Sequence, residues 1–387
     1  MELAWEKELT RRDFLKLCVS AGAGIGASMY AFDLMGKYKA YAAIGEKRGL
    51  HEALFYEKLS DGKVRCLLCP NFCELSEGQR GFCRVREPVG GKLNTLVYEL
   101  ICARHIDPIE KKPLFHVLPG SRSYSIATAG CNSRCKYCQN WTISQARPEE
   151  TVNERLSAGA LVSSAKNAGC DSIAYTYTEP VIFIEYAMAA GRAAAAADML
   201  NVWVTGGKIN PLPLKEACKH IDAANIDFKA FNDGYLRRIC AQDLKNIQGT
   251  IVTMKEQGVW VELTNLIVPT LNDDMDDIRK MAKWIRAEAG PDVPVHFSRF
   301  WPQYKLRSLY PTPVGTLKAA RQVALEEGLH YVYIGNVPEE NAESTVCPRC
   351  GNTVIERAGY RVLGNDLIGG KCRFCGNDVP GIWSKRG

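Results

Sequence analysis

Seven short runs of β-branched, aromatic and other hydrophobic residues recur along the middle of the chain, separated by longer stretches of helical composition. From the second run onward their starts lie about 24 to 37 residues apart, which is the length of a strand with its crossover helix. This pattern predicts a parallel sheet in a closed or partial α/β barrel. The runs cover residues 123–130, 172–180, 201–207, 225–231, 259–269, 293–300 and 330–336.

The chain is longer than a barrel of this kind needs. Its 387 residues, 46% of them hydrophobic, exceed the usual single domain of about 100 to 200 residues. We expect a signal (1–43), a cysteine-rich N-terminal cap (44–118), the barrel (119–340) and a small zinc-ribbon-like or rubredoxin-like C-terminal domain (341–387). The net charge of +6 is scattered along the chain, so it does not indicate nucleic-acid binding.

The first residues resemble a twin-arginine export signal. Arg11 and Arg12 precede an uncharged stretch from Leu17 to Phe32, and Ala40 and Ala42 offer a small-x-small cleavage site. The stretch is short for a membrane span, which needs about 20 residues. An amphipathic N-terminal helix with incidental arginines is the alternative, and no later segment is long and apolar enough to cross a bilayer.

Eleven of the 16 cysteines fall into three clusters. Within each cluster several cysteines are only two or three residues apart, a spacing that favours a shared metal or iron-sulfur cluster over strained disulfides. We therefore expect reduced thiols. The clusters are Cys66, Cys69, Cys73 and Cys83; Cys131, Cys135 and Cys138; and Cys347, Cys350, Cys372 and Cys375.

The central cluster has three cysteines where a closed metal site has four. A 4Fe-4S cluster needs one ligand for each iron, so three thiolates on one loop leave one iron open for a reactant, as a catalytic zinc keeps an open position. The alternative is a zinc loop or ferredoxin-like site that takes a distant fourth ligand.

The motif around Cys131, Cys135 and Cys138, with Tyr137 before the last cysteine, resembles the signature of the radical S-adenosylmethionine superfamily. The resemblance implies that S-adenosyl-L-methionine chelates the open iron. Reductive cleavage there yields a 5'-deoxyadenosyl radical, which abstracts hydrogen from a substrate. It also implies a partial barrel and an oxidoreductase that takes its electrons from a reductant such as flavodoxin or ferredoxin.

Two later motifs are similar to elements of the same superfamily. In "YTYTEP" Glu179 would pair with the methionyl ammonium group, although tyrosine and threonine replace the usual two glycines. In "DFKAFND" Lys229 would pair with the methionyl carboxylate, and Asp227 could hold a cation. Cys131, Cys135, Cys138, Glu179 and Lys229 are the expected catalytic set. Further expected cofactor contacts, at or near strand ends, are Tyr137, Thr205, Gly206, Asn265 and Arg299.

A closer resemblance is to the radical enzyme of the AmmeMemoRadiSam system. It covers most of the chain after about residue 50 and rests on "CLLCPNFCELSEGQRGFCRVRE", "CNSRCKYCQNWTIS", "LTNLIVPTLND", "HFSRFWPQYK" and "YIGNV". It implies Memo-type and AMMECR-type proteins as partners and leaves the substrate unidentified. The second candidate is a glycyl-radical activating enzyme of the pyruvate formate-lyase type. The non-enzyme alternative is an iron-sulfur electron carrier or a zinc-ribbon binding module.

The two outer cysteine clusters have different spacings. The N-terminal set, C-x2-C-x3-C-x9-C, could hold structural zinc or an auxiliary iron-sulfur cluster. The C-terminal set has two C-x-x-C knuckles, each followed by glycine, which predicts zinc or, with the same ligands, a single iron. S-adenosylmethionine and low-potential electrons are made inside the cell, whereas an export signal would direct the protein out of the cytoplasm. The sequence therefore leaves the cellular location of the protein open.

Overall fold

Seven of the eight strands of the central sheet are the seven runs that the hydrophobic pattern predicts. The structure, a computed structural model, describes residues 50–337 and 342–385. The expected export signal at 1–43 lies outside the described residues. The sheet has the order β16-β15-β14-β13-β12-β11-β9-β8. Its strands are β8 (Ala103–Pro108), β9 (Arg122–Ala127), β11 (Ser172–Tyr175), β12 (Leu200–Thr205), β13 (Ala223–Asp227), β14 (Trp260–Ile267), β15 (Val295–Arg299) and β16 (Val332–Gly335).

All neighbouring strands from β9 to β16 pair in parallel, whereas β8 pairs antiparallel with β9. The sequence analysis did not find β8, whose residues lie within the range assigned to the cap. Among the described strands, β8 and β16 are the two edges and share no ladder. The sheet is therefore a partial barrel with a gap between these edges.

Helices follow the parallel strands, as expected for crossover connections. Side chains cap several of them: Ser157 accepts a hydrogen bond from Ala160 N, and Asp243 accepts one from Asn246 N. The alanine-rich segment at residues 184–195 forms α5. The helices are α3 (Trp141–Ser144), α4 (Ala158–Asn167), α5 (Ile184–Ala195), α6 (Pro211–Cys218), α7 (Asp233–Tyr235), α8 (Leu244–Glu256), α9 (Met275–Trp284) and α10 (Val314–Glu326), with 3-10 turns η1 (Ile109–Lys111), η2 (Pro148–Glu150) and η3 (Pro180–Phe183) and π-helical turns η4 (Leu236–Cys240) and η5 (Ile285–Ala289).

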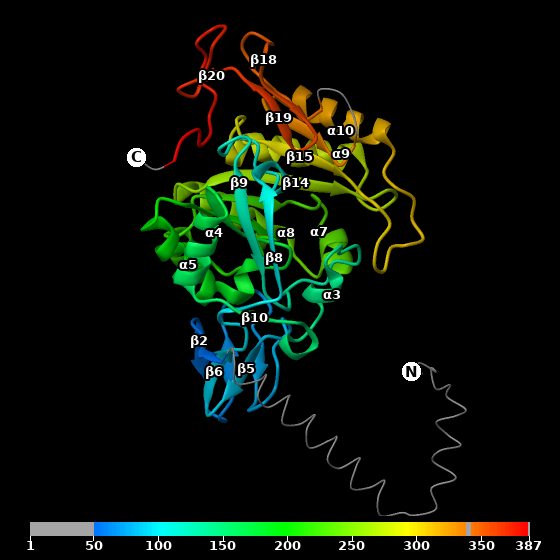
Figure 1. The fold of residues 1–387 in the computed structure, drawn as a ribbon. Coiled ribbons are helices and arrows are strands. Elements are labelled where there is room, and N and C mark those ends of the chain that lie inside the picture. Colours follow the sequence, from blue (N-terminus) through cyan, green and yellow to red (C-terminus); the bar gives the residue numbers. More distant parts are fainter. Residues whose placement is uncertain (1–49, 338–341, 386–387) are drawn as a thin grey trace, which may run out of the picture. The chain divides into compact units, whose positions relative to one another are not determined.

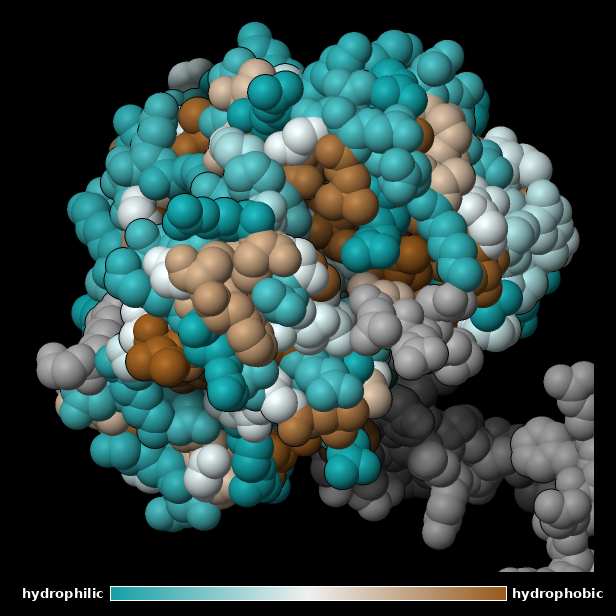
Figure 2. Space-filling view, turned by 90° about the horizontal axis from the view of Figure 1, so that it is seen from above, coloured by the Kyte–Doolittle hydropathy of each residue, from teal (hydrophilic) through white to brown (hydrophobic). Residues whose placement is uncertain are grey.

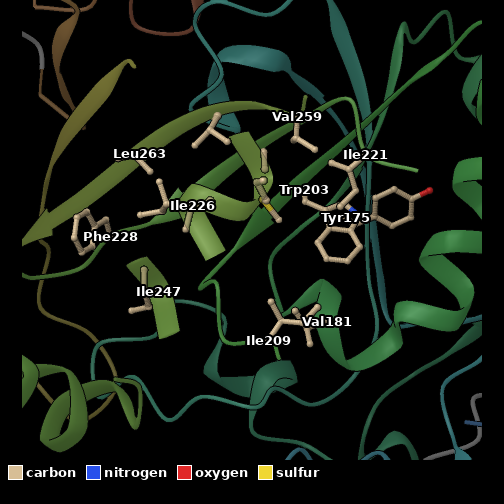
Figure 3. Close-up of a cluster of buried hydrophobic side chains, with 14 of the residues drawn as sticks. Tyr175, Val181, Trp203, Ile209, Ile221, Ile226, Phe228, Ile247, Val259 and Leu263 are labelled. Carbon is tan, nitrogen blue, oxygen red and sulfur yellow. The ribbon is translucent and has the colours of Figure 1, made fainter. Parts of the chain in front are cut away.

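The strands alternate between large apolar residues on the face toward the helices and small or polar residues on the opposite face. Tyr175, Trp203 and Ile226 pack in the main hydrophobic core (Figure 3). Their strand neighbours Ala174 and Val202 belong to a separate, smaller cluster. Because the inner face has short side chains, the partial barrel keeps room for a cavity.

Small antiparallel sheets flank the central sheet, and all described residues belong to one compact unit (Figure 1). We call residues 50–101 the cap and residues 342–385 the ribbon. The cap contains β1 (His51–Glu52), β2 (Tyr56–Lys58), β3 (Val64–Cys66), β4 (Glu74–Leu75), β5 (Arg86–Val89), β6 (Lys92–Thr95) and β7 (Leu100–Ile101), the last pairing with β10 (Glu154–Arg155); the ribbon contains β17 (Thr345–Val346), β18 (Thr353–Ala358), β19 (Arg361–Asn365), β20 (Leu367–Ile368) and β21 (Lys371–Cys372).

The face seen in Figure 2 is mainly hydrophilic, with hydrophobic residues gathered in separate patches. Within residues 50–337 and 342–385, no helix combines the length and the apolar character that a membrane crossing requires.

Candidate active site and metal centres

A cavity of about 710 Å³ opens on the inner face of the sheet. The three central cysteines come from the loop that follows β9, and all three line this cavity. The same cavity is lined by Glu179, which follows β11, and by Asp227 and Lys229 at the end of β13. Because parallel strands end at one edge of the sheet, residues distant in sequence meet there.

The cysteine loop is fixed by backbone contacts on both sides. Gly130, with φ 90°, approaches the cap so closely that an added Cβ would lie 2.5 Å from the carbonyl oxygen of Cys83. Arg134 N and Lys136 N donate to the carbonyls of Cys240 and Ile239, at 2.8 and 3.0 Å. These acceptors end the π-helical turn η4, a rare geometry that is frequent at functional sites.

The sulfurs of the loop have polar neighbours. Ser133 N donates to Cys131 Sγ at 3.3 Å, and Cys138 Sγ lies 3.3 Å from the Ser144 hydroxyl. Burial raises the pKa of the Cys131 and Cys138 thiols. A hydrogen bond from Cys240 lowers the pKa of Cys135, against the effect of burial. Three thiols facing one cavity, with amide donors on the sulfurs of Cys131 and Cys138, fit a 4Fe-4S cluster.

Glu179 is held by Thr205 and Gly206, two residues that the sequence analysis expected as cofactor contacts. Its Oε1 accepts a hydrogen bond from the Thr205 hydroxyl at 2.5 Å, and its Oε2 accepts one from Gly206 N at 2.8 Å. The residue is 3% exposed, and burial raises the pKa of its carboxyl group despite these donors. A Cβ on Gly206 would clash with Gln242 Nε2, so the Gln242 side chain would have to move.

Tyr177 adopts a glycine-like backbone with φ 63°. Its hydroxyl donates to Asp107, and its ring lies under the ammonium group of Lys112. Asn140 Nδ2 donates to the Tyr177 carbonyl at 2.9 Å, which joins this turn to the cysteine loop. The side-chain contacts hold a conformation that a tyrosine alone disfavours.

Lys229 is buried beside the cysteine loop, and its Nζ donates to Asp227 Oδ2 at 2.7 Å. Burial opposes its charge, but Asp227 and the nearby thiols of Cys135 and Cys240 outweigh that effect and raise the pKa of Lys229. The side chain is therefore a cation at neutral pH. It offers the cavity a positive charge next to the three cysteines.

Three expected cofactor contacts, Thr205, Asn265 and Arg299, do not line the cavity. Thr205 instead supports Glu179, and the other two lie on the outer face of the sheet. Asn265 pairs with Phe297 in the sheet and Arg299 pairs with Ile267, so both share the outer face with large apolar residues. The Asn265 amide donates to the Phe228 carbonyl, and Arg299 Nε donates to the Thr312 carbonyl. The period of two along each strand explains the difference, because their inner-face neighbours Thr264 and Ser298 do line the cavity.

Several cavity residues were missed by the sequence analysis. Gln242 Nε2 donates to Ser133 Oγ and to the Gly206 carbonyl, and so joins the cysteine loop to the Glu179 region. Tyr137, which was expected, is buried with its hydroxyl 3.2 Å from Cys240 Sγ. Lys112, on the cavity wall, is paired with Asp107, and burial lowers its pKa to about 8. No spacing motif marks Gln242 or Lys112.

The four C-terminal cysteines form a preorganised site. Their sulfurs lie within 4.8 Å of one another, and the Cys347–Cys375 and Cys350–Cys372 sulfurs are both 3.7 Å apart. A tetrahedral ion with metal–sulfur bonds of about 2.3 Å places its sulfurs about 3.8 Å apart. Gly351 and Gly376 turn each knuckle with positive φ. The geometry fits one metal ion.

The ribbon also forms part of the cavity wall, through Glu343 and Tyr360. It is attached by Arg357, which donates to the Phe115 carbonyl at 2.6 Å and pairs with Glu110 at 3.6 Å. On the other side, Thr345 Oγ1 lies 2.9 Å from the Tyr333 hydroxyl on β16. The ribbon therefore spans the gap between the β16 edge and the segment that follows β8.

The four N-terminal cysteines surround one small cavity in the cap, together with Arg86 and Asn132. Cys66, Cys69 and Cys83 are buried, and Cys73 is partly exposed. Burial raises the pKa of the three buried thiols. Asn132 directly follows Cys131, so this cavity adjoins the loop of Cys131, Cys135 and Cys138.

The comparisons with known proteins agree with this arrangement. Residues 125–285 match the family model described as the Radical SAM superfamily. An uncharacterized protein of Methanocaldococcus jannaschii is 45% identical over 332 residues, covering 85% of this chain and 99% of that protein. A pyruvate formate-lyase-activating enzyme of Staphylococcus aureus is 28% identical over 183 residues, covering 44% of this chain and 70% of the relative.

Among solved structures, a radical SAM methyltransferase from Sphaerobacter thermophilus aligns with a TM-score of 0.44 at 13% identity. The alignment covers 57% of this chain and 68% of that chain.

Proposed function

The chain belongs to the radical SAM superfamily and is a radical SAM enzyme, and we propose that Cys131, Cys135 and Cys138 are the ligands of its catalytic 4Fe-4S cluster. The observation that carries this proposal is the shared cavity, which the three cysteines line together with buried Glu179 and Lys229. When bound, the cluster supplies the electron for reductive cleavage of S-adenosylmethionine to methionine and a 5'-deoxyadenosyl radical.

Glu179 and Lys229 orient the amino-acid part of S-adenosylmethionine. Glu179 is an acceptor for the methionyl ammonium group, and Lys229 is a cation for the methionyl carboxylate. Opposite charges at the two positions distinguish the two ends of the zwitterion, and charge-assisted hydrogen bonds are stronger when buried. Thr205 and Gly206 hold the Glu179 carboxylate, while Asp227 positions the Lys229 ammonium group.

The walls of the cavity protect the chemistry from water. The residues at its base are buried, including Glu179, Lys229 and Tyr137. Exclusion of water limits side reactions of a reactive primary radical. The cavity wall also has Lys112, Tyr177 and Tyr360 as polar groups, so we expect a polar substrate.

The test is anaerobic formation of 5'-deoxyadenosine from S-adenosylmethionine and dithionite, with iron content measured on the same samples. Cys135→Ala should abolish product and lower the iron content. Cys170→Ala is the matched control, since Cys170 is a buried thiol that does not line the cavity. Product formation by Cys135→Ala at the wild-type rate would refute the assignment.

A second candidate is activation of a partner protein by hydrogen abstraction from glycine, favoured by the similarity to the activating enzyme of Staphylococcus aureus. The resemblance to the AmmeMemoRadiSam enzymes instead favours Memo-type or AMMECR-type proteins as partners. Adding each purified protein separately should reveal which one increases 5'-deoxyadenosine formation. A persistent glycyl radical signal on the added protein would support the activating function. Formation of 5'-deoxyadenosine without that signal would support modification of the added protein.

For the ribbon we propose zinc, because four thiolates at tetrahedral spacing close the site and leave no open position for a reactant. Metal analysis of the purified protein tests this assignment. About one zinc per chain supports it, whereas a single iron with rubredoxin-like absorption contradicts it.

Flavodoxin or ferredoxin is the proposed class of reductant for the catalytic cluster.

A further inference from the structure

We propose that Cys66, Cys69, Cys73 and Cys83 hold a second iron-sulfur cluster, and that the catalytic cluster receives its electron through it. This inference goes beyond the proposed function, which needs only one cluster. It rests on four features of the cap: the donors on the sulfurs, the spacing of the sulfurs, an unpaired polar group on the cavity wall, and the position of the cavity.

The four cap cysteines have the local geometry of metal ligands. The amides of Leu68, Asn71 and Val85, each two residues after a cysteine, donate to the sulfurs of Cys66, Cys69 and Cys83. Phe82 N donates to Cys73 Sγ at 3.4 Å. The same i+2 pattern recurs at Cys131 and in both knuckles of the ribbon.

Isolated cysteines of the chain differ in this respect. For Cys102, Cys170 and Cys218, the interactions of the thiol include no amide two residues later. Amide donors stabilise thiolates, which are the form that binds metals. The pattern therefore separates the cap cysteines from buried structural thiols.

The spacing of the sulfurs distinguishes a cluster from a single ion. In the described part of the chain, only the ribbon cysteines bring three or more possible ligand atoms within 4.8 Å of one another. The cap cysteines surround a shared cavity without meeting that limit, as do the three catalytic cysteines. A cluster places iron and sulfide between the cysteine sulfurs, so it requires the wider arrangement.

Arg86 supplies an independent indication of a bound group. It is 1% exposed, lines the cap cavity and forms a two-oxygen ion pair with Glu185 at 2.6 and 2.7 Å. Its Nε has no hydrogen-bond partner among the described residues. An unpaired buried donor is costly, and a sulfur atom of a cluster would accept from it.

The cap cavity lies next to the catalytic loop. Asn132, on its wall, follows Cys131 directly, and Asn71 Nδ2 donates to the Asn132 carbonyl at 3.3 Å. Lys208 contacts this carbonyl at 3.3 Å, and its charge acts on both Cys69 and Cys131. A cation between two thiolate-bound clusters offsets their negative charge.

The electron balance is simple. A low-potential one-electron donor, such as reduced flavodoxin, reduces the cap cluster, which passes that electron to the catalytic cluster and returns to its oxidised state. One electron is then consumed for each S-adenosylmethionine cleaved. No bond is formed or broken at the cap cluster, because all four of its cysteines are protein ligands.

The first measurement is the metal content and Mössbauer spectrum of the anaerobically reconstituted wild-type protein. Two 4Fe-4S clusters give about eight irons per chain. After reduction, S-adenosylmethionine should change the electron paramagnetic resonance spectrum of one cluster and leave the other unchanged, since only one has an open iron. About four irons with zinc in the cap would overturn the proposal, whatever the outcome of the 5'-deoxyadenosine assay.

The relay is tested with two donors. Cys73→Ser keeps an oxygen ligand at the partly exposed position, and Cys102→Ser is the matched control outside both cavities. With reduced flavodoxin, Cys73→Ser should form 5'-deoxyadenosine more slowly by an order of magnitude, whereas titanium(III) citrate, a small donor, should support near wild-type rates. Equal rates of Cys73→Ser and wild type with flavodoxin would overturn the relay.

Discussion

Glu179 is buried, and its carboxylate must be ionised to bind the methionyl ammonium group of S-adenosylmethionine. Because burial raises the pKa of its carboxyl group, protonation begins at a higher pH than for an exposed glutamate. We predict that affinity for S-adenosylmethionine is complete well above the raised pKa and falls as the pH decreases through it. Equilibrium binding measured anaerobically across pH checks this. Glu179→Gln should lose about 1.5 to 3 kcal/mol of binding free energy and show no such pH dependence; an unchanged affinity would contradict the assignment.

Gly130 is the residue at which the cap and the catalytic loop come closest. Alanine there would have a Cβ 2.5 Å from the Cys83 carbonyl and an unfavourable φ of 90°. We predict that Gly130→Ala lowers the free energy of unfolding by about 1 to 3 kcal/mol or more and lowers iron content. Chemical denaturation and iron analysis measure both.

Gly159→Ala is the control for this substitution, since a Cβ there meets no atom within 4 Å and the residue lies in α4. It should leave stability unchanged or raise it by up to about 1 kcal/mol. Similar losses in both variants would show that the close contact at Gly130 is not the cause.

At the scale of residues, the cysteine spacing and the resemblance of short motifs to those of the superfamily predicted the members of the cavity that belong to one short loop or strand end. Cys131, Cys135, Cys138, Glu179 and Lys229 all line it. Asn265 and Arg299 were expected in the cavity because of their positions near strand ends. Their side chains lie on the outer face instead, because successive residues of a strand alternate between the two faces. Gln242 could not be predicted, because it reaches the site only through the fold of the η4 region.

At the scale of elements, the parallel strands were predictable because each is an apolar run followed by a helix. β8 was not, because His105 and Ile106 are exposed and its pattern lacks an apolar face. The pairing of β8 with β9 is set by tertiary structure and has no local signal.

The ribbon is attached to the barrel by a buried ion pair. Arg357 and Glu110 are both fully buried, and Arg357 also donates to the Phe115 carbonyl. We predict that Arg357→Ala lowers the free energy of unfolding by about 3 to 5 kcal/mol, because Glu110 is left without its cation. Denaturant titration measures the loss.

Arg373→Ala is the matched control within the ribbon. Its partner is Asp366, and both side chains are more than a third exposed, at 54% and 35%. Exposed pairs contribute at most about 1 kcal/mol, so this variant should be nearly as stable as wild type. A small effect of Arg357→Ala would indicate that the ribbon is held mainly by its other contacts.

At the scale of the whole molecule, ligand binding should be coupled to unfolding. S-adenosylmethionine at 100 times its dissociation constant should stabilise the cluster-loaded protein by about 2.7 kcal/mol. Anaerobic denaturation with and without S-adenosylmethionine measures this. The cluster-free protein should show a much smaller effect, because the iron-chelating contact is missing. Equal stabilisation of both forms would mean that S-adenosylmethionine binds elsewhere.

The ribbon spans the gap between β8 and β16, so the barrel and the ribbon contribute separate parts of the cavity wall. The residues proposed to bind the cluster and S-adenosylmethionine follow strands of the barrel, whereas Glu343 and Tyr360 on the cavity wall belong to the ribbon. Tyr360 lies in the short turn between β18 and β19. Replacement of this turn can therefore change which molecule is admitted while the inherited catalytic core stays intact, so that new specificity can arise by exchange of a short peripheral hairpin.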